Sequence, residues 1–118
     1  MFPAFITPAT INKAKAVWEQ MVDQGGKLVS MESPDEQLVI SNVRARTARP
    51  KIMGLFDRTE QSYDQEKYIV MTKVDWLAGH TPEKFVRIRW DEEDHLILSY
   101  TEVYLGDVVF GYRFLVKG

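Results

Sequence analysis

The sequence predicts a mainly β protein in which one N-terminal helix packs on a small antiparallel β-barrel or sandwich. Only one segment, close to the N-terminus, has apolar residues at helical spacing. After Gly26 the chain alternates between short β-branched or aromatic runs and turn-forming residues, as strands and hairpins do. One helix followed by a run of strands is typical of a sheet that is covered on one side by the helix.

Size and composition limit the chain to a few classes of protein. Its 118 residues can bury one core, so we expect a single domain spanning 1–118. The net charge of -2 is too small to indicate a particular class of partner. The absence of cysteine excludes disulfides, thiol catalysis and cysteine-bound zinc. No P-loop, dinucleotide-binding, nucleophile-elbow or zinc-protease motif occurs. We therefore expect no enzyme activity, no cofactor and no metal.

The first element is an extended arm, residues 1–9, in which Pro3 and Pro8 interrupt an apolar stretch that exposes Phe2 and Phe5. No basic region precedes it, so it does not resemble a signal peptide, and no apolar run reaches the ~18 residues of a membrane span. We expect no membrane partner. The helix follows over 10–23, capped by Thr10 and ended by Gly25 and Gly26.

The remaining elements are strands. Composition places them at 27–31, 37–45, 51–56, 67–76, 84–90, 95–105 and 108–117. Between 57 and 66 the segment "DRTEQSYDQE" is polar and without a pattern, which predicts a flexible loop inside the barrel region 27–117.

Two turns set the register of the last three strands. A four-residue loop at "DEED" pairs Trp90 with His95, and a two-residue turn at Gly106-Asp107 pairs Leu105 with Val108. Because side chains alternate, the two turns together predict one core face. It consists of Val86, Ile88, Trp90, Ile97, Val103, Leu105, Val108, Phe110, Phe114 and Val116.

The stretch "WDEEDH", residues 90–95, has two interpretations. Carboxylates beside His95 resemble a metal or acid–base site, but three or four convergent ligands are needed and the only other histidine, His80, is distant in sequence. Acids also suit a solvated hairpin tip. We therefore predict a turn.

The opposite face of the meander combines aromatic residues, arginine and leucine, a composition enriched at protein interfaces. Alternatively, the helix covers part of this face and the arginine heads extend to water. Both interpretations stay open. Its members are Phe85, Arg87, Arg89, Leu96, Leu98, Tyr100, Tyr104, Val109, Arg113 and Leu115.

A basic segment, 43–51, carries Arg44, Arg46, Arg49 and Lys51. A small barrel with such a strand could hold a nucleic-acid strand. The other interpretation is a solvated edge that meets an acidic partner or the protein's own acidic loop. A third possibility for the whole fold is a barrel that binds a small ligand in its aromatic core.

From about residue 50 the chain resembles the bacteriophage head–tail joining family, the neck or head-closure and tail attachment proteins. The resemblance rests on "KIMGLFDRTEQSYD", "KYIVMTKVDW", "EKFVRIRW" and "HLILSYTEVYLGDVVFGYRFLV", and a helix before the first strand is compatible with it. The Pro-interrupted N-terminus, the basic segment and the short end after the last strand depart from the family's pattern, so adaptor, head-closure and tail-terminator positions all stay open.

The resemblance implies a structural protein of the virion neck. In this family a small barrel repeats as a ring, six or twelve copies here, between portal or adaptor and tail, and double-stranded DNA passes through the lumen without sequence-specific contacts. Loop 57–66 is then the segment that orders on assembly. Its residues Asp57, Glu60, Tyr63 and Asp64 would face the basic segment of a neighbour.

Overall fold

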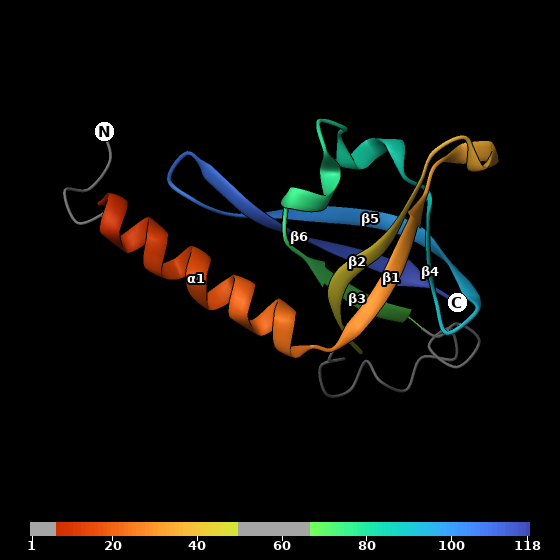
Figure 1. The fold of residues 1–118 in the computed structure, drawn as a ribbon, viewed down its shortest axis with the longest axis horizontal. Helices are drawn as coiled ribbons and strands as arrows, with labels where there is room; N and C mark the ends of the chain where they lie inside the picture. Colours follow the sequence, from red (N-terminus) through yellow and green to blue (C-terminus); the bar gives the residue numbers. More distant parts are fainter. Residues whose placement is uncertain (1–6, 50–66) are drawn as a thin grey trace, which may run out of the picture.

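One N-terminal helix precedes a closed antiparallel β-barrel of six strands in the computed structural model, which describes residues 7–49 and 67–118 (Figure 1). Around the barrel the strands follow the order β1-β2-β3-β6-β5-β4, and β4 pairs with β1 to close it. The elements are α1 (Pro8–Gln24), β1 (Lys27–Glu32), β2 (Val39–Ala48), β3 (Lys67–Thr72), β4 (Arg87–Trp90), β5 (Glu93–Leu105) and β6 (Val108–Lys117), with short 3₁₀ turns η1 (Pro34–Glu36), η3 (Asp75–Leu77) and η4 (Pro82–Lys84).

The predicted fold class is confirmed, and closure decides in favour of a barrel rather than a sandwich. Because the barrel is closed, each strand has a paired neighbour on both sides within the barrel, and no edge strand is left there. The predicted strand 51–56, the loop 57–66 and arm residues 1–6 lie outside the described residues.

The helix begins earlier than the sequence analysis predicts. Thr7, not Thr10, is the N-cap, and its side-chain oxygen accepts a hydrogen bond from the Thr10 backbone N–H. Pro8 occupies the first turn, where a missing N–H costs nothing and the fixed φ suits a helix. The expectation that the prolines exclude helix throughout 1–9 was therefore wrong for Pro8. The helix ends before Gly25, as predicted.

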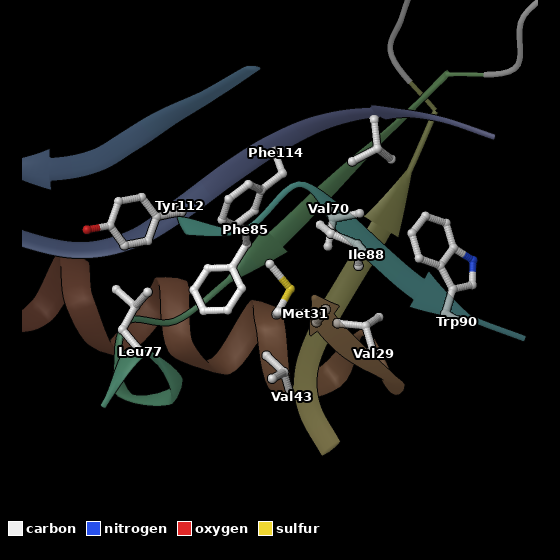
Figure 2. Packing of buried hydrophobic residues seen from close by; sticks show 12 residues of the cluster. Val29, Met31, Val43, Val70, Leu77, Phe85, Ile88, Trp90, Tyr112 and Phe114 are labelled. Atoms are coloured by element: carbon white, nitrogen blue, oxygen red, sulfur yellow. The ribbon is translucent and has the colours of Figure 1, made fainter. Parts of the chain in front are cut away.

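Apolar side chains from the strands and the short turns fill the barrel interior (Figure 2). The side chains of Met31, Ile88 and Phe114 are wholly buried, and Leu77 from η3 joins them at one end. Because β-branched and aromatic residues alternate along each strand, one side of every strand supplies this core. The buried set is Val29, Met31, Val43, Ala45, Val70, Leu77, Phe85, Ile88, Trp90, Tyr112, Phe114 and Val116.

The β4–β5 turn is tighter than predicted. Asp91 and Glu92 alone form it, both with positive φ, and Trp90 pairs with Glu93 instead of His95. The slip is two residues, so it keeps the predicted faces, and Ile88 and Trp90 are buried as expected. The Gly106-Asp107 turn was placed correctly, because Leu105 pairs with Val108.

Two bulges in the β5–β6 pair change which side chains of β5 reach the core. The first adds a residue to β5 between Ile97 and Ser99, and the second adds Phe110 to β6, where Val103 pairs with Gly111 and Tyr104 with Val109. Between these bulges the alternation is reversed, so Tyr100 pairs with Phe114 and packs against the core. Its predicted outward position was wrong.

Phe85 was also predicted to face outward and is instead buried in the core. It lies before β4 begins, at the end of η4, where the strand alternation does not apply. Five residues of the predicted core face are not fully buried. Val86 and Ile97 are half-buried, and Val103, Leu105 and Val108 are half-buried or exposed because the end of the β5–β6 hairpin extends past the barrel.

Candidate protein interface

The β5–β6 hairpin continues beyond the barrel as a two-stranded ribbon. β3 pairs with β6 only over Tyr112–Lys117, and β4 pairs with β5 only over Glu93–Leu96. Past these ranges the two strands pair with each other, apart from a 2.8 Å hydrogen bond from the Ile97 N–H to the Val86 carbonyl, and Figure 1 shows them running out beside the N-terminal half of α1. A two-stranded ribbon is marginally stable by itself. It therefore needs support from the helix or from a partner.

The ribbon tip, defined here as Glu102–Val108, is acidic and partly apolar. Tyr104 is 63% exposed, and Val108 is also exposed. Glu102 and Asp107 are exposed carboxylates that form no ion pair with the described residues. No Lys or Arg occurs between Leu96 and Tyr112, so nothing within the ribbon offsets their charge.

Trp18 attaches the helix to the barrel where the ribbon leaves it. Its indole N–H donates a 3.0 Å hydrogen bond to the Thr72 carbonyl on β3. The ring lies over Gly111 of β6, where a Cβ atom would come within 2.0 Å of the indole nitrogen. Only glycine leaves room for the ring at this place. One turn later Val22 is fully buried, whereas Val17 is 62% exposed.

Charged contacts also hold the C-terminal end of the helix. Lys73 Nζ lies 2.9 Å from Asp23 Oδ1, and this hydrogen bond is the main reason that the pKa of Lys73 is raised. Arg46 of β2 donates to the Met21 carbonyl at 3.5 Å, and its Cβ contacts the backbone at Gly25. Only this end of α1 is therefore fixed to the barrel.

Most cations of β2, β3 and β6 point outward. These three strands contain no Asp or Glu, and their apolar core residues alternate with Arg44, Arg46, Lys67, Arg113 and Lys117. Met71 on β3 pairs with Arg46 on β2 and with Arg113 on β6. Lys67 on β3 lies directly opposite Lys117 on β6. Two ammonium groups opposite each other on adjacent strands repel, and this repulsion is relieved when an anion binds.

We call part of this surface the basic face. Its apolar centre consists of Ile69 and Leu115, which pair across β3 and β6, and of Leu96 and Leu98 on the neighbouring β5. Leu96 and Leu98 are 45% and 42% exposed. The cations at its margin are Lys67, Arg113 and Lys117. An apolar centre with a charged margin is the usual anatomy of a protein–protein interface.

The basic segment predicted from the sequence is only partly described. Arg44 and Arg46 share the outer side of β2, as predicted, because the buried Val43 and Ala45 alternate with them. Arg49 lies 5.4 Å above the ring of Tyr68. Lys51 lies outside the described residues, as do Phe2, Phe5, Asp57, Glu60, Tyr63 and Asp64.

The other predicted interface residues are not brought together on one surface. Arg87 is half-buried in an ion pair with the buried Glu32, at 3.4 Å, and Arg89 pairs with Asp94 at 3.3 Å. Tyr104 lies at the ribbon tip and Arg113 on the basic face.

Tyr100 closes one end of the barrel through its hydroxyl. It donates a short hydrogen bond to the Glu83 carboxylate on η4. This bond favours the phenol and the carboxylate, so it raises the pKa of Tyr100 to about 12 and lowers that of Glu83. The contact joins η4 to β5 near the point where Phe85 enters the core.

The acidic turn and His95 do not form a shared site. His95 is buried, and its ring stacks on Trp90 with 3.6 Å between centroids. Asp91 instead pairs with Lys27 at 2.8 Å. Among the residues that the structure describes, no group of three or more His, Asp or Glu side chains is placed to hold a metal ion. The turn interpretation of residues 91–92 is correct, although the loop is shorter than predicted.

A surface pocket of about 320 Å³ adjoins the basic strand, and Arg44, Lys73, Asp75 and Trp76 line it. Two cations beside an indole could hold a carboxylate or phosphate, but the ion pair with Asp23 occupies Lys73, and Asp75 repels an anion. In the described part of the chain, no helix is long and apolar enough to cross a membrane.

The sequence analysis missed the contact between Trp18 and Gly111 and the projecting ribbon. Strand lengths carried a signal for the ribbon, because the predicted strands 95–105 and 108–117 are longer than their neighbour at 84–90 and must overhang it. Comparisons of this chain with protein families, with curated proteins and with solved structures find no match.

Proposed function

We propose that this protein is a structural component of the neck of a tailed phage, where copies form a ring that closes the DNA-filled head and connects it to the tail. One observation carries the proposal. The barrel bears two additions, the helix α1 and the projecting β5–β6 ribbon, whose apolar residues Val17 and Tyr104 are largely exposed. Exposed apolar side chains on extensions of a small barrel are typical of assembly surfaces.

A ring of identical subunits needs two different surfaces that complement each other, because each copy contacts both of its neighbours. This chain has such a pair of opposite sign, the acidic ribbon tip and the cationic strands β2, β3 and β6. The helix before the barrel and the long closing hairpin also agree with the pattern on which the resemblance to head–tail joining proteins rests. We place the protein in the virion, between portal or adaptor and tail.

The test is a phage that lacks this gene. It should produce packaged heads and complete tails that do not join, or heads that lose DNA, and the wild-type gene supplied in trans should restore infectious particles. Normal infectious particles without the gene refute the proposal.

Variants supplied in trans locate the function on β2. Arg44→Glu with Arg46→Glu should fail to restore joining although the purified protein stays folded, with its stability lowered by no more than the exposed hydrogen bond of Arg46 to the Met21 carbonyl contributes. Arg44→Lys with Arg46→Lys keeps the charge and should restore it. If the charge-reversed protein restores joining fully, β2 is not an assembly surface.

A second candidate is a nucleic-acid-binding barrel, favoured by the absence of acids from β2, β3 and β6. Binding to an oligonucleotide that weakens steeply with salt would support it. The apolar centre of the basic face favours a protein partner instead, because phosphate contacts need polar donors rather than leucine. A small-ligand barrel has less support, since Met31, Ile88 and Phe114 fill the interior.

A further inference from the structure

We propose that the ribbon tip of one copy docks on the basic face of a second copy, an inference that rests on the proposed ring and names the two surfaces that build it. The two surfaces are complementary in both charge and polarity. The tip offers Glu102 and Asp107 around the exposed Tyr104, and the face offers cations around Ile69 and Leu115.

Charge complementarity selects the partner. Lys67 and Lys117 lie opposite each other on adjacent strands, and Arg113 lies on the same face of β6, on the other side of Leu115. None of the three forms an ion pair with a described residue. Two carboxylates that approach this group relieve the repulsion between the lysines. An aromatic side chain on the same segment can then cover the leucines, which suits Tyr104.

Geometry prevents a copy from binding its own tip. The tip and the face belong to the same two strands, and at about 3.3 Å per residue Asp107 lies about 26 Å from Leu115 along β6. A pleated strand cannot fold back over this distance, so the contact must join two molecules. Because the tip and the face are different surfaces, the contact is heterologous and can repeat around a ring.

A tip of a few residues buries less surface than a stable pair of proteins needs, so one contact is weak. Closing a ring multiplies such contacts without strengthening any one of them. The experiment must therefore detect a transient encounter.

Cysteine cross-linking provides this measurement, because the chain contains no cysteine of its own. Tyr104→Cys protein is mixed with Leu98→Cys protein under mild oxidation, and we expect a disulfide-linked heterodimer to form at least about tenfold faster than in the control mixture. The control pairs Tyr104→Cys with Val39→Cys, which is equally exposed but lies on β2 outside the basic face. Equal rates for the two mixtures overturn the proposal.

Charge reversal provides a second, independent measurement. Asp107→Lys in the Tyr104→Cys copy should abolish the rate advantage, and Lys117→Glu in the Leu98→Cys copy should restore it. Glu92→Lys in the tip-bearing copy is the matched control, the same charge change at a distant acidic turn, and should have no effect. A thermal unfolding curve for each variant shows that it is folded.

This outcome is separable from that of the proposed function. Selective cross-linking in a protein whose loss leaves head–tail joining intact would refute the neck function and support the contact. A phage that needs the gene but tolerates Asp107→Lys would support the neck function and overturn the contact.

Discussion

Gly111→Ala should destabilise the protein through the indole of Trp18. The glycine's φ is not in the left-handed region, so on backbone grounds alone alanine should stabilise the fold by about 0.4–1 kcal/mol. The added methyl, however, would lie 2.0 Å from the Trp18 Nε1 atom and 2.8 Å from the Thr72 carbonyl oxygen. Neither distance is tolerated, so the ring must leave its position.

The cost follows from what the ring loses. Its hydrogen bond to the Thr72 carbonyl contributes about 1 kcal/mol, and a buried carbonyl left unpaired costs about 1–3 kcal/mol. Half-buried indole packing against β6 adds about 1 kcal/mol. After subtraction of the backbone gain, we expect the free energy of unfolding to fall by about 2–4 kcal/mol, measured by equilibrium denaturation in urea.

A double-mutant cycle identifies the cause. In a Trp18→Ala background the same substitution should cost at least about 1 kcal/mol less than in the wild type, because the indole no longer opposes the methyl and only the Thr72 carbonyl does. Gly79→Ala is the matched control, since nothing lies within 4 Å of its position and only its φ of 89° resists alanine. Additive costs of the substitutions at Trp18 and Gly111, or a stabilised Gly111→Ala protein, would refute this account.

Three further predictions concern the core, the acidic turn and the barrel end. Phe114→Ala removes a wholly buried ring and should cost about 3–5 kcal/mol in urea denaturation; a loss below about 1 kcal/mol would contradict its place in the core. Replacing Glu92 and Glu93 by Gln should change stability by less than about 0.5 kcal/mol, and a metal-dependent stability that these changes abolish would contradict the turn. Absorbance titration should show Tyr100 ionising near pH 12, and Glu83→Gln should lower that value. Because the pKa of Tyr100 is raised in the folded state and that of Glu83 is lowered, this bond's stabilisation is complete between about pH 4.5 and pH 10. It is lost between about pH 10 and 12 as Tyr100 ionises, and below about pH 4.5 as Glu83 is protonated. Ionisation of Tyr100 near pH 10 in the wild type would exclude the bond.

The sequence was sufficient to predict the helix, the strands that the structure describes and the faces of β4 and of the barrel part of β6, because these depend on local periodicity. Phe114 and Val116 alternate with the outward Arg113, Leu115 and Lys117 on the part of β6 beyond its bulge, so they were assigned correctly. The predicted pairing of β4 with β5 was wrong by two residues at the Asp91 turn, but the faces were unchanged because side chains alternate with a period of two.

Features set by tertiary contacts could not be predicted. The bulge in β5 at Leu98 has no glycine or proline to mark it, and it brings Tyr100 into the core. Phe85 follows the 3₁₀ turn η4 and packs against Trp76, with 5.3 Å between ring centroids, which strand alternation does not predict. Gly111 looked like an ordinary strand glycine until Trp18 was placed over it.

Trp18 and Gly111 also connect stability with the proposed assembly. The ribbon leaves the barrel at Gly111, beneath the indole, so we expect this contact to limit the angle at which the ribbon projects. That angle fixes where the tip stands relative to the basic face on the same copy. In a chain of heterologous contacts, the constant relation between two such surfaces sets the rotation from one subunit to the next, and therefore whether the assembly closes into a ring or continues as a helical filament. A loosened indole should thus alter the geometry of the assembly even where the barrel itself stays folded.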